Sequence, residues 1–158
     1  MTGAGKTTAA RLLSEYVTRV AVIGMDKVKR FISDFKRCEK DNAIAKDLVF
    51  SMTKIYFDHN ISVIVEQPFK SEKELKKYEI LAKRYKIPIY KIQLFADPQL
   101  AFKRVLNRQK NCEDPAPKER IKRNISLFRK KKDKDFVTID TSNITSQQVA
   151  KDILKLLK

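Results

Sequence analysis

The sequence predicts an α/β protein with a mainly parallel sheet, and two observations lead to this prediction. Apolar residues at helical spacing alternate along the chain with short runs of β-branched residues. Strands separated by helices of this length indicate β-α-β crossovers, which set parallel strands side by side with helices on both faces. We therefore expect a three-layer αβα arrangement.

The individual elements follow from these two kinds of spacing. Asp97 followed by Pro98 is typical of a helix start, and Thr145 with Gln148 three residues later resembles a capping box. Seven segments have helical spacing: 9–16, 28–35, 44–55, 75–85, 100–106, 121–128 and 149–156. Four segments are predicted strands: 20–23, 61–65, 89–95 and 136–139.

Composition narrows the class of protein. The chain has 158 residues, of which 42% are hydrophobic, so we expect one globular domain over residues 1–158. Its longest apolar runs, such as 61–65, fall far short of the roughly 20 residues that a membrane-spanning helix needs. Two distant cysteines support neither a disulfide framework nor a zinc cluster. We expect a cytoplasmic protein without a membrane partner, and favour a monomer.

A phosphate-binding motif stands at the start of the chain. Residues 2–8, Thr-Gly-Ala-Gly-Lys-Thr-Thr, match the second part of the pattern G-x-x-x-x-G-K-[ST]. Glycines there let backbone N–H groups turn toward phosphate oxygens, Lys6 neutralises the β and γ phosphates, and the Thr7 hydroxyl binds Mg²⁺. The first glycine of the pattern would fall one position before Met1. We therefore expect the chain to lack the first, central strand that precedes such a loop.

The chain resembles the small, adenylate-kinase-like P-loop kinases, in particular the compact AAA-type kinases and the zeta-toxin-like and chloramphenicol-phosphotransferase-like members. The resemblance covers nearly the whole chain and implies a P-loop NTPase fold that binds ATP and Mg²⁺. It rests on five segments in order: Gly3-Ala4-Gly5-Lys6-Thr7-Thr8, Gly24-Met25-Asp26-Lys27, Val63-Ile64-Val65-Glu66, Arg104-Val105-Leu106-Asn107-Arg108 and Ile139-Asp140-Thr141-Ser142.

Two carboxylates are candidate site residues. In kinases that look like this one, the acidic residue at the position of Asp26 faces the acceptor hydroxyl as a base or positioning group. Its alternative role is a helix N-cap. Glu66 ends an apolar strand where a Mg²⁺-binding carboxylate would stand, although the family more often has Asp there. Glu66 could equally be a charged residue without a special role, at the point where the chain leaves a buried strand.

Two arginines and a late turn complete the candidate site. Arg104 and Arg108 lie four residues apart, on one helix face, at the approach to a lid expected at about 108–130. Arginines delivered by a closing lid stabilise the phosphoryl group during transfer, whereas the alternative is a pair of surface arginines. Thr141 and Ser142 resemble the loop that borders the adenine ring, and would also serve as a turn and cap.

The positive charge is concentrated around the expected lid. The chain has 35 Lys and Arg against 19 Asp and Glu, for a net charge of +16, and residues 102–134 hold 13 of the cations and four of the acids. This concentration allows nucleic acid as acceptor or partner, while solvated basic helices remain an alternative. A regulatory GTPase is disfavoured because no glycine follows Gly24.

Two functions follow from the sequence. The leading one is an ATP-dependent phosphotransferase that moves the γ-phosphoryl group to a hydroxyl acceptor, which is a small molecule or a nucleoside or nucleotide. Lys6, Asp26, Arg104 and Arg108 would act in catalysis, and Thr7 and Glu66 would organise Mg²⁺. The alternative is a non-catalytic P-loop protein that binds nucleotide or nucleic acid without transfer.

Overall fold

The computed structural model describes all residues except 37, 70, 111–114, 130–134 and 158. They form two compact units: unit 1 comprises Met1–Leu12 and Tyr90–Lys158, and unit 2 comprises Leu13–Ile89. The expectation of a single domain over 1–158 stays a prediction. Within the described ranges, no helix combines the length and apolar character that crossing a membrane requires.

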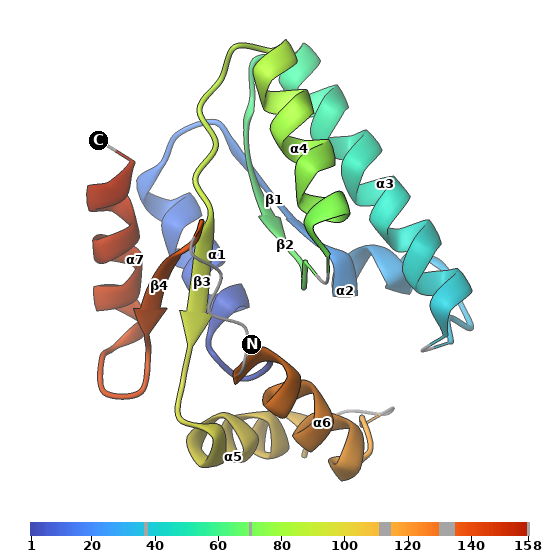
Figure 1. The fold of residues 1–158 in the computed structure, drawn as a ribbon, viewed down its shortest axis with the longest axis vertical. Helices are drawn as coiled ribbons and strands as arrows, with labels where there is room; N and C mark the ends of the chain where they lie inside the picture. Colours follow the sequence, from blue (N-terminus) through green and yellow to red (C-terminus); the bar gives the residue numbers. More distant parts are fainter. Residues whose placement is uncertain (37, 70, 111–114, 130–134, 158) are drawn as a thin grey trace. The chain divides into compact units, whose positions relative to one another are not determined.

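Unit 1 contains a parallel pair of strands with helices (Figure 1). Strand β3 runs beside β4, and Phe95 pairs with Asp140, so both strands end at the same edge. Helices α5 and α6 pack against each other, and Val105 and Ile121 are buried. The elements are α1 (Lys6–Tyr16, which continues into unit 2), β3 (Ile92–Phe95), α5 (Pro98–Gln109), α6 (Lys118–Arg129), β4 (Val137–Asp140) and α7 (Ser146–Leu156).

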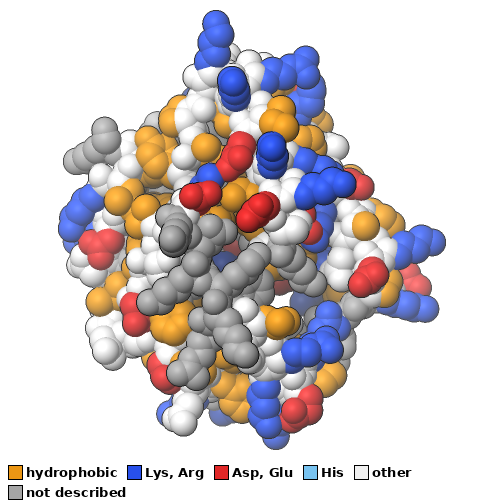
Figure 2. All heavy atoms as spheres, in the orientation of Figure 1, with side chains coloured by type: hydrophobic (Ala, Val, Ile, Leu, Met, Phe, Trp, Pro, Cys, Tyr) orange, Lys and Arg blue, Asp and Glu red, His pale blue; other side chains and the backbone are white. Residues whose placement is uncertain are grey.

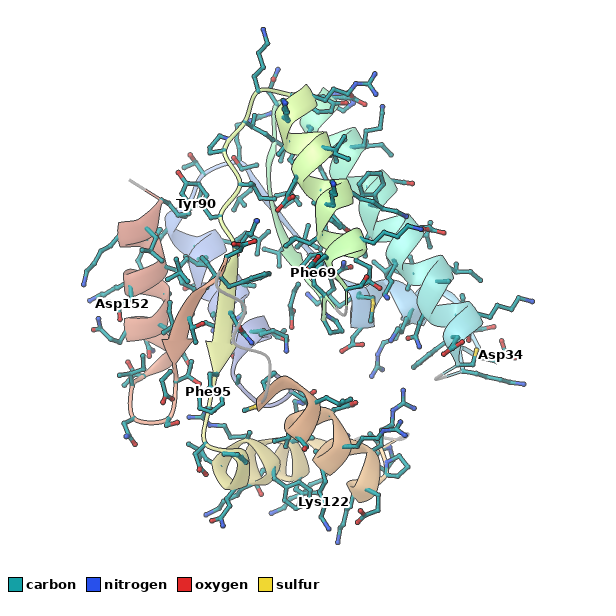
Figure 3. All side chains as sticks on the ribbon, viewed as in Figure 1. Asp34, Phe69, Tyr90, Phe95, Lys122 and Asp152 are labelled. Carbon is teal, nitrogen blue, oxygen red and sulfur yellow. The ribbon has the colours of Figure 1, made fainter. Side chains whose placement is uncertain are left out.

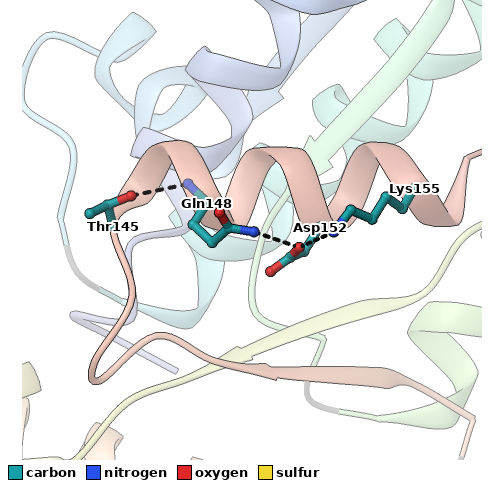
Figure 4. A network of polar contacts seen from close by, with 4 residues as sticks. All are labelled: Thr145, Gln148, Asp152 and Lys155. Atoms are coloured by element: carbon teal, nitrogen blue, oxygen red, sulfur yellow. Dashed lines mark hydrogen bonds and ion pairs between the residues drawn. The ribbon is translucent and has the colours of Figure 1, made fainter.

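Side-chain caps set the starts of α5 and α7. Asp97 Oδ1 accepts hydrogen bonds from the N–H groups of Gln99 and Leu100, 2.9 and 3.0 Å away, and Pro98 opens α5. At α7, Thr145 Oγ1 accepts from the Gln148 N–H at 3.2 Å, while the Gln148 side chain donates to Asp152 (Figure 4). Both predicted helix starts are confirmed, because a side-chain oxygen satisfies N–H groups that have no partner inside the helix.

Unit 2 also contains a parallel pair of strands. Strands β1 and β2 pair in register from Val20 opposite Ser62 to Gly24 opposite Glu66. Helix α3 packs on both strands through a core that includes Ile23 and Val49. The elements are β1 (Val20–Gly24), α2 (Met25–Val28), the 3-10 helix η1 (Lys29–Phe31), α3 (Glu39–Asp58), β2 (Ser62–Glu66) and α4 (Glu72–Arg84).

The α/β class with parallel strands is confirmed, and the main local difference lies after β1. The spacing predicts one helix over 28–35, but α2 and η1 end at Phe31, and Ile32 has an extended backbone. The side chain of Phe31 is 72% exposed whereas Val28 is buried, so only the start of this apolar spacing lies in the core. The third strand is also shorter than predicted, beginning at Ile92 rather than at residue 89.

Candidate functional site

The P-loop of unit 1 turns through two glycines in left-handed conformations. Gly3 has φ +78° and Gly5 has φ +83°, which are angles that other residues rarely adopt. A Cβ on Gly3 would also lie 2.4 Å from the Ala101 carbonyl oxygen, so the loop backbone lies directly against α5. A Cβ on Gly5 would meet nothing within 4 Å. Packing and backbone conformation therefore both require Gly3, whereas conformation alone requires Gly5.

The loop leads straight into α1. The helix begins at Lys6, and the Ala9 N–H donates to the Gly5 carbonyl at 2.9 Å. Gly5, Thr7 and Thr8 are exposed, and Lys6 is half-buried with its Nζ 2.9 Å from the Met1 carbonyl. The N-terminus of a helix carries a partial positive charge, and Lys6 adds a full charge beside it. This arrangement suits a phosphate group.

Thr141 ties the end of β4 to the P-loop. It is only 3% exposed, and its Oγ1 lies 3.2 Å from the Ala4 carbonyl and 2.9 Å from the Phe95 carbonyl. Arg104 on α5 donates from Nη1 to Thr141 Oγ1 at 3.3 Å and from Nη2 to the Thr141 carbonyl at 3.0 Å. The structure thus brings together three segments that are far apart in the sequence.

Ser142 fastens the neighbouring turns to each other. Its hydroxyl donates to Asp140 Oδ1 at 2.6 Å and accepts from the Asp97 N–H at 2.8 Å. The Ser142 N–H also donates to Asp140 Oδ1, at 2.9 Å. The Ser142 hydroxyl, and then its N–H, lower the pKa of the Asp140 carboxyl, because both stabilise the ionised form. The turn and cap role expected for Thr141 and Ser142 is present.

Unit 2 holds the two candidate carboxylates at the ends of neighbouring strands. Asp26 is the second residue of α2, whose N-cap position is occupied by Gly24, and the Asp26 side chain is 94% exposed. Its Oδ1 lies 3.4 Å from Nζ of Lys29, a lysine whose side chain is only 10% exposed. A Cβ on Gly24 would lie 3.4 Å from Glu66 Oε2, so the Glu66 carboxylate stands beside the end of β1.

Unit 2 also contains an aromatic cluster. Tyr78 on α4 packs edge-on against Phe50 and Phe69, with ring centroids 5.3 and 5.5 Å away, and Phe69 follows the end of β2 (Figure 3). Burial raises the pKa of Tyr78 to about 12, and the nearby Gln67 amide opposes this effect. Neither Gln67 Oε1 nor the Tyr78 hydroxyl has a well-formed hydrogen bond within the described chain.

The expected lid is described in part. Helix α6 lies within 108–130 and packs on α5, while 111–114 and 130 lie outside the described residues. Arg108 is exposed on α5, and Lys122 projects outward from α6, with its side chain 60% exposed (Figure 3). Arg104 and Arg108 therefore have different surroundings, although both follow the same helical spacing.

Several contacts around the site were not expected from the sequence. Ala101 packs against Gly3, Asp97 and Asp140 hold Ser142, and Lys29 pairs with Asp26. The Asp97-Pro98 start of α5 was a visible signal for the Asp97 cap, but nothing in the sequence marks its link to Ser142. Among the residues that the structure describes, no three His, Cys, Asp or Glu side chains are grouped to hold a metal ion.

Comparison with known proteins gives a family and a fold. The family model described as an AAA domain matches residues 1–130. A search of curated proteins finds no match.

Three solved structures are similar over almost their whole length. A candidate kinase from Chloroflexus aurantiacus has a TM-score of 0.69 at 18% identity, covering 98% of this chain and 93% of its own. The tunicamycin resistance protein of Deinococcus radiodurans has a TM-score of 0.65 at 17% identity, and the match covers 98% of this chain and 90% of that protein. The APS kinase of Mycobacterium tuberculosis, in complex with AMPPNP and APS, has a TM-score of 0.65 at 14% identity, and the match covers 99% of this chain and 92% of that kinase. At these identities the likeness establishes the fold, which is that of P-loop kinases.

Proposed function

The chain belongs to the AAA-domain family, and we propose that it is an ATP-dependent phosphotransferase that moves the γ-phosphoryl group of ATP to a hydroxyl acceptor. One observation carries this proposal: two left-handed glycines lead into the N-terminus of α1, with Lys6 at its first position. The fold shared with kinases, one of which was solved with AMPPNP, adds support.

The residues of the P-loop fit ATP and Mg²⁺. Exposed Gly5, Thr7 and Thr8 would present N–H groups and hydroxyls to the phosphates, and Lys6 would neutralise the β and γ phosphates. Mg²⁺ prefers oxygen ligands and commonly takes only one or two from the protein, so the Thr7 hydroxyl and the Glu66 carboxylate would each suit it by chemical type. When bound, the ion would neutralise charge on the phosphate oxygens.

The transfer itself needs an acceptor base and a cation for the moving group. Asp26 would take the proton from the acceptor hydroxyl while the hydroxyl oxygen bonds to the γ-phosphorus. The bond between the γ-phosphorus and the β–γ bridging oxygen breaks at the same time, which leaves ADP. The Asp26 side chain is 94% exposed, so its carboxylate is open to an acceptor, and its Oδ1 lies 3.4 Å from Nζ of Lys29. Arg108 would stabilise the charge on the phosphoryl group.

Two variants and a charge control test the proposal. ADP release from ATP would be measured against a panel of sugars, nucleosides and amino alcohols. We expect Lys6→Ala and Asp26→Asn each to lower the turnover by about a hundredfold or more, with unfolding midpoints unchanged. Lys103→Ala, an exposed lysine on α5, should keep the wild-type rate. Equal ADP release by the wild type and both site variants would contradict the proposal.

A second candidate function is binding of nucleotide or nucleic acid without transfer. It is favoured by the basic surface of α5 and α6, where Arg108, Lys122 and Arg123 are exposed. Figure 2 shows Lys and Arg side chains spread over the visible face, with acidic side chains among them. Binding of single-stranded RNA that weakens steeply with salt, in a protein that releases no ADP, would favour this function over the first.

A further inference from the structure

We propose that Arg104 and Thr141 are positioning residues that fix the direction of the Gly5 N–H in the P-loop. This inference rests on the proposed nucleotide binding, because it assigns the Gly5 N–H to a phosphate oxygen. It gives Arg104 a role at the phosphate loop in place of the lid role that its sequence position suggests.

The Arg104 guanidinium is hydrogen-bonded to Thr141. Two of its nitrogens donate to two different oxygens of this one residue, the hydroxyl at 3.3 Å and the carbonyl at 3.0 Å. A forked contact of this kind needs the planar, multi-donor guanidinium group, which lysine cannot replace. Because Thr141 is 3% exposed, both contacts are buried at the Thr141 end. Arg104 thereby fixes both the backbone and the hydroxyl of Thr141.

Thr141 in turn holds the Ala4 carbonyl. The Thr141 hydroxyl accepts from Arg104, so its single hydrogen is left to be shared between the carbonyls of Ala4 at 3.2 Å and Phe95 at 2.9 Å. The Thr141 N–H also donates to the Phe95 carbonyl, at 2.8 Å, which anchors the residue to β3. Ala4 itself is 0% exposed, so its carbonyl would lose an internal partner if the hydroxyl were removed.

The direction of the Gly5 N–H follows from the geometry of one peptide bond. The Ala4 carbonyl and the Gly5 N–H belong to the same planar unit, and in a trans peptide they point in opposite directions. No cis peptide is present in the described chain. A carbonyl held inward at Thr141 therefore aims the Gly5 N–H outward, and Gly5 is exposed. An outward N–H beside Lys6, at a helix N-terminus, suits a phosphate oxygen.

Helix α5 fixes the other side of the same loop. Ala101 lies one turn before Arg104, and its carbonyl oxygen is so close to Gly3 that a Cβ there would lie only 2.4 Å from it. Residues three apart share a helix face, so α5 presents its backbone to Gly3 and its arginine to Thr141. The loop is thus held from both sides of Ala4.

Binding of ATP provides the first test. Thr141→Val keeps the shape of the side chain and removes the hydroxyl, whereas Thr141→Ser keeps the hydroxyl. We expect Thr141→Val and Arg104→Lys to raise the Kd for ATP by about five- to tenfold, as expected for the loss of one or two hydrogen bonds. Thr141→Ser should remain within about twofold of the wild type. Lys103→Gln, an exposed charge change on α5, is the matched control and should match the wild type.

Amide hydrogen exchange in the ligand-free protein provides the second test. The Ala9 N–H bonds to the Gly5 carbonyl at 2.9 Å, and the Val149 N–H bonds to the Thr145 carbonyl at 3.0 Å, so the two report the first turns of α1 and α7. Thr141→Val should speed exchange at Ala9 several-fold, leave Val149 unchanged, and be rescued in Thr141→Ser.

The outcomes separate this inference from the proposed function. Faster exchange at Ala9 in a protein whose wild type binds no ATP would support the positioning role and reject the nucleotide site. Unchanged exchange and unchanged ATP affinity in Thr141→Val would overturn the positioning role alone. Equal acceleration at Ala9 and Val149 would indicate general destabilisation and would also overturn it. An Arg104→Lys protein that binds ATP as the wild type does would contradict the forked contact.

Discussion

The phosphate loop of unit 1 and the strand ends of unit 2 are built in opposite ways. Around the loop, Gly3 packs on a helix backbone, and Thr141 and Arg104 use their polar atoms inside the protein. At the strand ends of unit 2, Asp26 is 94% exposed and pairs with Lys29. The loop is therefore preorganised, whereas the Asp26 carboxylate is held loosely at the surface.

This difference suits the two halves of a transfer reaction. Every ATP molecule presents the same phosphates, so a rigid loop loses little entropy on binding and can be specific for them. The proposed acceptor site would have to fit one particular molecule, and an exposed side chain such as Asp26 would be free to rearrange around it on binding. On this account, changes around the loop should lower stability or nucleotide affinity, and changes at Asp26 should affect turnover alone.

The largest contrast in stability is expected between two glycines. Gly3→Ala places a Cβ 2.4 Å from the Ala101 carbonyl oxygen, at a residue whose φ is +78°. It should lower the free energy of unfolding by about 3 kcal/mol or more. Gly24→Ala in unit 2 has an ordinary extended backbone, with φ −103°, and its Cβ would be 3.4 Å from the Glu66 side chain. It should change the free energy of unfolding by less than about 0.5 kcal/mol. Urea denaturation of both proteins measures the contrast.

A Gly3→Ala protein as stable as Gly24→Ala would show that the loop does not pack tightly on α5. Gly5→Ala sharpens the comparison, because its Cβ meets nothing within 4 Å although φ is +83°. Gly5→Ala should lower the free energy of unfolding by about 1–2 kcal/mol, through its backbone conformation alone.

A smaller, pH-dependent effect is expected at the turn beside the loop. The pKa of the Asp140 carboxyl is lowered by Ser142, so the folded state favours the ionised form. Its contribution to stability should be present above the ordinary pKa of 3.8 and be lost as the pH falls through the lower folded value. Asp140→Asn should thus be slightly less stable than the wild type at pH 7, and the gap should close below about pH 4. A gap that is constant from pH 7 to 3 would contradict this account.

The smallest effect is expected inside unit 2. The Tyr78 hydroxyl is buried without a well-formed hydrogen bond in the described chain, so Tyr78→Phe should change the free energy of unfolding by less than about 1 kcal/mol. Ultraviolet titration of the wild type should leave one tyrosine neutral until about pH 12, as burial of Tyr78 requires. A loss of several kcal/mol in Tyr78→Phe would reveal a partner for this hydroxyl.

The sequence predicted the elements whose signals are local. Helices and strands followed from apolar spacing, the start of α5 from Asp97-Pro98, and the P-loop from its glycines and Lys6. The prediction of a helix over 28–35 was wrong after Phe31, where Ile32 has an extended backbone, and Phe31 itself is 72% exposed. Spacing alone cannot show whether an apolar stripe finds a partner.

The contacts that distinguish the candidate site residues could not be predicted. Arg104 and Arg108 share one helical face and looked equivalent, yet Arg104 bonds to Thr141, 37 residues further along the chain, while Arg108 is exposed. Such contacts depend on how α5 and β4 pack, and no local pattern records them. The roles of Asp26, Glu66 and Arg108 remain predictions for the same reason.

An ATP titration of the wild-type protein and of Lys6→Ala tests the central claim most directly, with Lys103→Ala as the charge-matched control. The account predicts saturable binding in the wild type and in Lys103→Ala, and affinity weakened by about tenfold or more in Lys6→Ala, because a charge-assisted contact to phosphate is lost. Equal ATP affinity in the wild type and Lys6→Ala, or no saturable binding in the wild type, would contradict it.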